Sequence, residues 1–154
     1  MATPEHVVFV YGTLKKGLYN YRRFLEPAEA RGKAVFVGAA KTASADFHLV
    51  VDPEYFVPCV YRAPGGDGYQ IPGELFRVDD DTLRELDRLE GVEHRWYLRE
   101  QVQVELLDGA AKGEIVSCFG YIMPVRNELL AYPRIAEYTG DDSALRLPEG
   151  ISVP

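Results

Sequence analysis

The stretch GELFRVDDDTLRELDRLEGV, residues 73–92, carries the clearest structural signal in this chain of 154 residues. Its first residues read as the end of a strand, and residues 80–90 read as a helix. Leu83, Leu86 and Leu89 recur every three residues, which places them in one apolar stripe along a helix. The pattern predicts a helix that packs this stripe against a core.

Both ends of the predicted helix carry the residues that usually terminate helices. Asp79 or Asp80 can cap the first turn, where acidic side chains also suit the helix dipole. Gly91 is a typical residue for the left-handed turn that ends a helix. The helix is therefore expected to begin just after one of the two aspartates and to end at Glu90.

Glu90 is a candidate for chemistry because it lies one residue beyond the leucine stripe. A carboxyl group half-drawn into an apolar wall has a raised pKa, and a general acid and base near neutral pH needs such a pKa. An ordinary solvated glutamate is the alternative interpretation. Glu74, in PGELF, is a second candidate, and its alternative is a charge on an edge strand.

The N-terminal run VVFVY, residues 7–11, predicts a strand that is buried on both faces. Gly12 interrupts it, and the chain continues as TLKKG to Gly17. A loop bounded by glycines after a buried strand can expose backbone N–H groups. This loop is therefore a candidate anion-binding site.

Further strands and short helices complete the expected organisation, which is one domain over residues 1–154 with a core at about 7–123 and a C-terminal extension at 124–154. Pro58 and Pro72 favour edge positions or bulges for their strands. The hairpin-like order of the strands indicates an α+β domain with one main helix and a curled sheet or small barrel. Strands are expected at 34–42, 46–51, 55–62, 69–78, 96–107 and 114–123, with a helix within 18–31 that ends near Pro27 and another at 127–138 before an extended tail.

Composition excludes several classes of function. The formal net charge of −7 disfavours nucleic acid as a partner, because an acidic protein repels a phosphate backbone. No apolar run is long enough for a transmembrane helix and the N-terminus does not resemble a signal peptide, so a cytoplasmic protein without membrane contact is expected. Cys59 and Cys118 stand in apolar runs and are expected to be buried free thiols.

Motifs for several common chemistries are absent from the sequence. It has no serine elbow, no HExxH zinc motif and no phosphate loop with the required spacing. His6, His48 and His94 are far apart along the chain, and surface or core positions are expected for them. No cofactor and no metal is therefore predicted, and carboxylates remain as the reactive groups.

The segment VFVYGTLKKG at residues 8–17, together with residues 73–92, resembles the γ-glutamylcyclotransferase-like (AIG2-like) family. Asn20, Tyr97 and the CFGY segment at 118–121 also fit the family pattern. Within the family, the γ-glutamylamine cyclotransferase branch is the most similar. The resemblance implies a small mixed, mostly antiparallel β-barrel with one main helix.

The resemblance also implies a reaction in which the α-amine of a γ-glutamyl group attacks its own γ-carbonyl. The products are 5-oxoproline and a free amine. Glu90 is the implied catalytic acid and base. Tyr11, Gly12, Thr13, Leu14 and Tyr97 are the implied substrate-binding residues, although Tyr11 and Tyr97 could serve packing alone and Thr13 could serve only the turn.

Three functions remain open. The first is cyclotransfer on a γ-glutamyl-amine such as γ-glutamyl-ε-lysine, and the second is the same chemistry on γ-glutamyl amino acids or another γ-glutamyl metabolite. The third is a non-catalytic ligand-binding module. We expect the leaving-group side of the pocket to involve residues in 15–23 or after Met123. The sequence favours neither a monomer nor a dimer.

Overall fold

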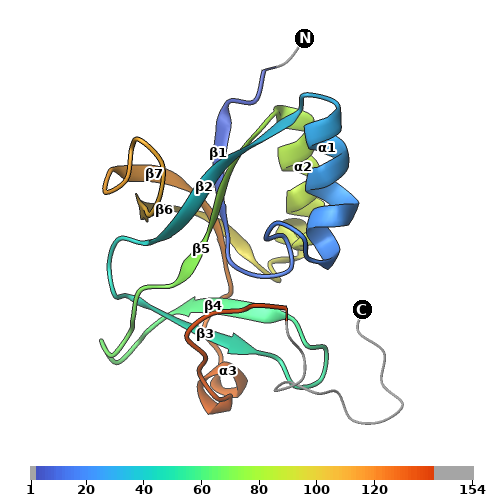
Figure 1. Ribbon diagram of the computed structural model, residues 1–154. Helices are drawn as coiled ribbons and strands as arrows, with labels where there is room; N and C mark the ends of the chain where they lie inside the picture. Colours follow the sequence, from blue (N-terminus) through green and yellow to red (C-terminus); the bar gives the residue numbers. More distant parts are fainter. Residues whose placement is uncertain (1–2, 141–154) are drawn as a thin grey trace.

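Five strands close into a barrel in the computed structural model, which describes residues 3–140 (Figure 1). Neighbouring strands are antiparallel except for the first and last of the five along the chain, which pair in parallel. This mixed barrel confirms the predicted fold class. Around the barrel, the order is β1 (His6–Val10), β5 (Pro72–Val78), β2 (Ala34–Thr42), β6 (Leu98–Leu106) and β7 (Ile115–Ile122).

A second, two-stranded sheet is inserted between β2 and β5. It consists of β3 (Phe47–Val51) and β4 (Pro58–Arg62), paired antiparallel. Strand β4 is shorter than predicted because the chain turns between Asp52 and Val57, where the backbone N–H of Asp52 donates to the Val57 carbonyl oxygen at 3.0 Å.

The two prolines in strands occupy the first residue of each strand. Pro58 begins β4 and Pro72 begins β5. The predicted edge position for the second strand is wrong, because β5 lies between β1 and β2. A strand tolerates proline at its first residue, where the missing N–H is not needed by the ladder. The register irregularity of this pair falls in β2, between Phe36 and Gly38.

Helices cover one side of the barrel, where α1 (Glu26–Ala30) and α2 (Asp80–Leu89) lie next to each other (Figure 1). A π-helical turn, η1 (Tyr21–Leu25), leads directly into α1. The prediction that this helix ends near Pro27 is wrong. Pro27 stands in the first turn of α1, where its missing N–H would have no intrahelical partner.

Helix α2 has the capping predicted from its sequence. The Asp79 side chain accepts a hydrogen bond from the Thr82 backbone N–H at 2.9 Å, and Gly91 adopts a left-handed conformation with φ of 65° just after the helix. Leu83 and Leu86 are buried in the core. A short 3₁₀ turn, η2 (Val92–His94), then leads towards β6.

Alternate residues of β1 face two different cores. Val8 and Val10 pack into the cluster that contains the leucines of α2, whereas Phe9 packs with the apolar residues of β6. Tyr11, immediately after the strand, follows Phe9 because side chains alternate along a strand. The predicted burial of this run on both faces is confirmed.

The segment after β7 crosses the two-stranded sheet of β3 and β4, called the outer sheet below. It contains one short helix, α3 (Asn127–Ala131). The prediction of a helix to residue 138 is wrong. Tyr132 has φ −77° and ψ 145°, the extended conformation that a following proline, here Pro133, favours. The predicted extended tail lies largely outside the described residues.

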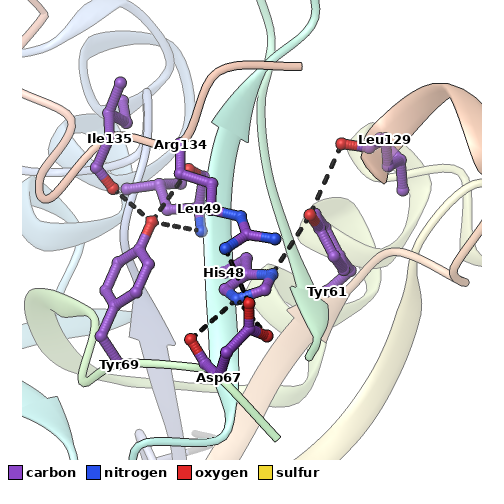
Figure 2. A network of polar contacts seen from close by, with 8 residues as sticks. All are labelled: His48, Leu49, Tyr61, Asp67, Tyr69, Leu129, Arg134 and Ile135. Carbon is purple, nitrogen blue, oxygen red and sulfur yellow. Dashed lines mark hydrogen bonds and ion pairs between the residues drawn. The ribbon is translucent and has the colours of Figure 1, made fainter. Parts of the chain in front are cut away.

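A polar network fastens this segment to β3 and β4 (Figure 2). His48 is fully buried; one ring nitrogen lies 3.2 Å from the Tyr61 hydroxyl and the other 3.2 Å from a carboxylate oxygen of Asp67, which also pairs with Arg134 at 2.9 Å. The Tyr69 hydroxyl donates to the Ile135 carbonyl oxygen at 2.6 Å. The network holds residues 129–135 against the outer sheet.

Within residues 3–140, no helix combines the length and the apolar composition that a membrane crossing requires. The cytoplasmic location stays a prediction.

Candidate active site

A cavity of about 640 Å³ opens where β1, the end of α2 and the segment before β6 meet. The six residues predicted from the sequence come from three separate parts of the chain, and all six line this cavity. They are Tyr11, Gly12, Thr13, Leu14, Glu90 and Tyr97.

The turn after α2 positions Glu90. Its backbone N–H donates to the Leu86 carbonyl oxygen at 2.9 Å, so the residue continues the last helical turn. Its carbonyl oxygen accepts the N–H of Tyr97 at 3.3 Å. The left-handed Gly91 allows the chain to reverse here, and a Cβ at that position would lie 2.4 Å from the Trp96 ring.

The carboxyl group of Glu90 makes no hydrogen bond or ion pair with the residues at 3–140. Burial raises its pKa from 4.5 to about 7, because no neighbouring cation or hydrogen-bond donor compensates for the lost hydration. The Glu90 charge also raises the pKa values of Tyr11 and Tyr97. The carboxyl group therefore lies close to both tyrosines and is half ionised near neutral pH.

Tyr11 and Tyr97 form buried walls of the cavity with hydroxyl groups that are already bonded. The Tyr11 hydroxyl donates to the Tyr121 carbonyl oxygen at 2.6 Å, and the Tyr97 hydroxyl donates to the Pro58 carbonyl oxygen at 2.8 Å. Burial raises the pKa of both phenols well above 10, so both stay neutral. Each tyrosine thus connects the cavity wall to another strand.

The loop after β1 is shaped by its own hydrogen bonds and by close packing. The Thr13 carbonyl oxygen accepts the N–H groups of Asn20 and Tyr21, each at 3.0 Å, and the Thr13 hydroxyl accepts the Asn20 side-chain amide at 2.8 Å. A Cβ on Gly12 would lie 2.4 Å from Cγ of Pro58. Glycine is therefore required here by packing against β4.

The backbone N–H groups of Gly12, Thr13 and Leu14 donate to no acceptor in the described part of the chain. Consecutive N–H groups without partners are uncommon beside a core, since most buried backbone donors are paired. Such groups can bind a carboxylate or a developing oxyanion.

Glu74 lies outside the cavity. Its carboxylate accepts the backbone N–H of Lys16 at 2.5 Å and so ties the loop after β1 to β5. Cys59 and Cys118 are buried and free, as predicted. Burial raises the pKa of the Cys59 thiol to about 11, which keeps it protonated at neutral pH.

Several lining residues were not identified from the sequence. Asp52 and Tyr55 come from the turn between β3 and β4, and Trp96 precedes Tyr97. Arg23 and Arg126 come from the two regions expected to serve the leaving group, but their sequence neighbours carry no pattern that would single them out. They reach the cavity only through the tertiary fold.

A small α+β barrel with a half-ionised carboxyl group in an open cavity is typical of an acid–base enzyme. The chain belongs to a family with such a fold: the sequence model described as gamma-glutamyl cyclotransferase, AIG2-like, matches residues 8–139. Membership places the chain among the cyclotransferase enzymes.

Relatives and solved structures agree with this assignment. The chain is 37% identical over 115 residues to gamma-glutamylaminecyclotransferase B of Danio rerio, which covers 75% of this chain and 58% of that protein. It is 37% identical over 117 residues to gamma-glutamylaminecyclotransferase of Rattus norvegicus, which covers 74% of this chain and 75% of that protein. The crystal structure of an AIG2-like protein from Mus musculus superposes with a TM-score of 0.77 at 33% identity, over 91% of this chain and 93% of that one.

Proposed function

We propose that this protein converts a γ-glutamyl-amine into 5-oxoproline and the free amine, with Glu90 as the general acid and base. The observation that carries the proposal is the Glu90 carboxyl group, which lines the cavity without a partner among the described residues and has a pKa of about 7. The names of the relatives support the substrate class.

The nucleophile of this reaction belongs to the substrate. The α-ammonium group loses a proton to the Glu90 carboxylate, and the resulting amine attacks the γ-carbonyl carbon to close a five-membered ring. Enclosure of the folded γ-glutamyl group favours this attack, because an oriented intramolecular reaction avoids most of the entropy loss of an encounter. No serine or cysteine nucleophile is required.

Collapse of the tetrahedral intermediate breaks the bond to the leaving nitrogen. Protonated Glu90 returns its proton to that nitrogen, and the extra proton of the ring nitrogen ends on the released amine as ammonium. A carboxyl group with a pKa near 7 suits both steps, because it accepts and donates a proton at similar cost.

The loop after β1 provides donors for the negative charges of the substrate. The free N–H groups of Gly12, Thr13 and Leu14 are suited to the α-carboxylate or to the oxyanion that forms on the γ-carbonyl oxygen. Tyr11 and Tyr97 enclose the site without ionising, because both hydroxyl groups are already bonded to carbonyl oxygens.

The substitution Glu90→Gln tests the proposal directly. We expect the turnover of γ-glutamyl-ε-lysine to fall by about 10²- to 10⁴-fold, the contribution typical of general acid–base catalysis. The assay follows 5-oxoproline by mass spectrometry. Glu85→Gln is the matched control, since Glu85 is an exposed residue of α2 outside the cavity, and it should keep wild-type turnover. Turnover retained in Glu90→Gln would refute the assigned role.

A substrate panel separates the remaining alternatives. Formation of 5-oxoproline from γ-glutamyl-alanine in preference to γ-glutamyl-ε-lysine would favour γ-glutamyl amino acids as substrates. Ligand binding in a thermal-shift assay without product from either compound would favour a binding module. The proposed mechanism uses no metal, so turnover is expected to survive EDTA.

A further inference from the structure

We propose that Arg126 and Asp52 form a subsite for the leaving group, one that recognises the charged α-amino and α-carboxyl groups of a released amino acid. The inference rests on the proposed cyclotransfer and adds the residues that bind the departing amine. Both side chains line the cavity that holds Glu90. Arg126 comes from the segment just before α3, and Asp52 comes from the turn after β3.

Arg126 is the more available of the two arginines on the cavity. Its only ion pair in the described residues is a loose one with Glu128, at 3.8 Å between Nε and the carboxylate, and both side chains are at least half exposed. Arg23, in contrast, donates to the Asn20 side chain at 3.1 Å and lies over the rings of Tyr19 and Phe24. Among residues 3–140, the guanidinium of Arg126 therefore has no close ion pair, and it can bind a carboxylate with two parallel hydrogen bonds.

Asp52 supplies the opposite charge from a fixed position. Its Oδ1 atom accepts the backbone N–H groups of Glu54 and Tyr55 at 2.7 and 3.3 Å, which holds the carboxylate in place and leaves Oδ2 without a partner in residues 3–140. The residue is only 7% exposed. A carboxylate oxygen that lines a cavity without a partner is a suitable acceptor for a substrate ammonium group.

The two charges are neighbours but do not pair with each other. Burial is the main cause of the raised pKa values of the Cys59 thiol and the Tyr132 phenol, and in both groups Asp52 adds to the rise whereas Arg126 opposes it. No ion pair joins their side chains within the described residues. Two opposite charges that line one cavity without pairing complement a zwitterion better than they complement a neutral amine.

Neither charge forms an ion pair with the proposed catalytic group among residues 3–140. Burial accounts for the raised pKa of Glu90. Tyr55, 53% exposed on the same turn as Asp52, lines the cavity and offers an apolar surface to an alkyl chain. γ-Glutamyl-ε-lysine fits this arrangement, because the departing lysine carries its charged α-amino and α-carboxyl groups at the far end of a flexible alkyl chain.

Four substrates test the two charges one at a time. The first is γ-glutamyl-ε-lysine, and the other three replace lysine by cadaverine, which lacks the carboxylate, by 6-aminohexanoate, which lacks the ammonium group, and by pentylamine, which lacks both. Wild-type protein should show the highest kcat/KM for the lysine compound and the lowest for the pentylamine compound. Each missing charge should cost about tenfold, as expected for loss of one charge-assisted hydrogen bond.

Two variants assign the charges to residues. Arg126→Gln should remove the preference for lysine over cadaverine while the preference for lysine over 6-aminohexanoate remains. Asp52→Asn, which keeps an oxygen acceptor for the turn, should do the reverse. Arg77→Gln, an exposed arginine of β5 outside the cavity, is the matched control and should change neither ratio.

The outcomes separate the two proposals. Equal kcat/KM for all four substrates in wild-type protein would overturn the subsite while cyclotransfer still stands. Wild-type preferences that survive in both variants would also overturn it. Failure to form 5-oxoproline from any of the four would refute cyclotransfer on γ-glutamyl-amines, and the subsite with it. The comparison within wild-type protein needs no variant, so it holds even if Asp52→Asn does not fold.

Discussion

At the scale of single residues, the most informative property is the isolation of the Glu90 carboxyl group. Acidic residues are abundant in this chain, and those with partners are held by cations or backbone donors, as Asp67 is by Arg134 and Asp79 by Thr82. Glu90 has neither and is half-buried beside two tyrosines. Its raised pKa is therefore a result of desolvation, and hydration of the site would lower the pKa again.

The pH dependence of turnover should report this pKa. In the free enzyme Glu90 must be ionised to accept the first proton, so kcat/KM should rise about tenfold per pH unit below pH 7 and level off above it. The measurement is kcat/KM for γ-glutamyl-ε-lysine from pH 5 to 8. A midpoint near 4.5, the ordinary value for glutamate, would contradict the desolvated site.

The same shift predicts that Glu90 destabilises the fold at neutral pH. A carboxyl pKa that is higher in the folded state than in the unfolded state means that stability is fully present below about 4.5 and is lost as the pH rises through about 7. Glu90→Gln should therefore raise the free energy of unfolding at pH 8 by about 2–3 kcal/mol. Urea unfolding at pH 8 and pH 4.5 would measure it, and the gain should vanish at the lower pH.

At the scale of elements, the site depends on how the ends of β1 and α2 meet the inserted strand β4. Gly12 packs against Pro58, and Gly91 packs against Trp96, so two close contacts without a Cβ define the cavity wall. The loop after β1 is then held by Asn20, which bonds the hydroxyl and the carbonyl oxygen of Thr13. Glycine is thus needed at positions 12 and 91 mainly for close packing, and the exposure of backbone N–H groups is a secondary consequence.

Gly12→Ala should displace the loop, because the added methyl group would lie 2.4 Å from Cγ of Pro58. We expect a loss of about 1–3 kcal/mol in stability from overpacking and a larger loss of turnover. Thermal unfolding and the 5-oxoproline assay measure the two effects. Combination with Pro58→Ala should recover part of the stability, and a double variant no more stable than Gly12→Ala would contradict this packing account.

At the scale of the whole molecule, the cavity is shared between the barrel and the segment that follows it. The network around His48 and Tyr69 fastens residues 129–135 to the outer sheet (Figure 2). Arg126 lies in the same stretch of chain, between β7 and α3. The position of one cavity wall thus depends on contacts outside the barrel.

Tyr69→Phe should weaken this attachment. The hydroxyl accepts the Leu49 N–H at 3.0 Å and donates to the Ile135 carbonyl oxygen at 2.6 Å, and its loss leaves both groups without a partner. We expect a loss of about 1–3 kcal/mol in stability, together with a raised KM. Urea unfolding and steady-state kinetics measure these. Tyr19→Phe is the control, since Tyr19 is 56% exposed; an equal loss there would contradict the attachment.

Local sequence patterns predicted the helices and strands themselves better than they predicted which elements lie next to one another. The capping of α2 by Asp79 and Gly91 and the buried strand before Gly12 followed from short-range rules. The errors arose where the tertiary context decided. Pro27 was expected to end a helix and instead lies in the first turn of one. Pro72 was expected at a sheet edge or a bulge and instead begins a strand with a neighbour on each side. A proline excludes only its own N–H from bonding, and the fold decides whether that N–H is needed.

The amino-acid sequence was enough to predict the fold class, because strand alternation and helix caps are local features of the chain. Its resemblance to a family was enough to predict six residues that line the cavity. Only the tertiary structure brought Asp52 and Arg126 to the same cavity. Their separation along the chain is bridged by strand pairing and by the buried network around His48. The interaction of two charges depends on the distance between them in space, and the order of residues along the chain does not give that distance.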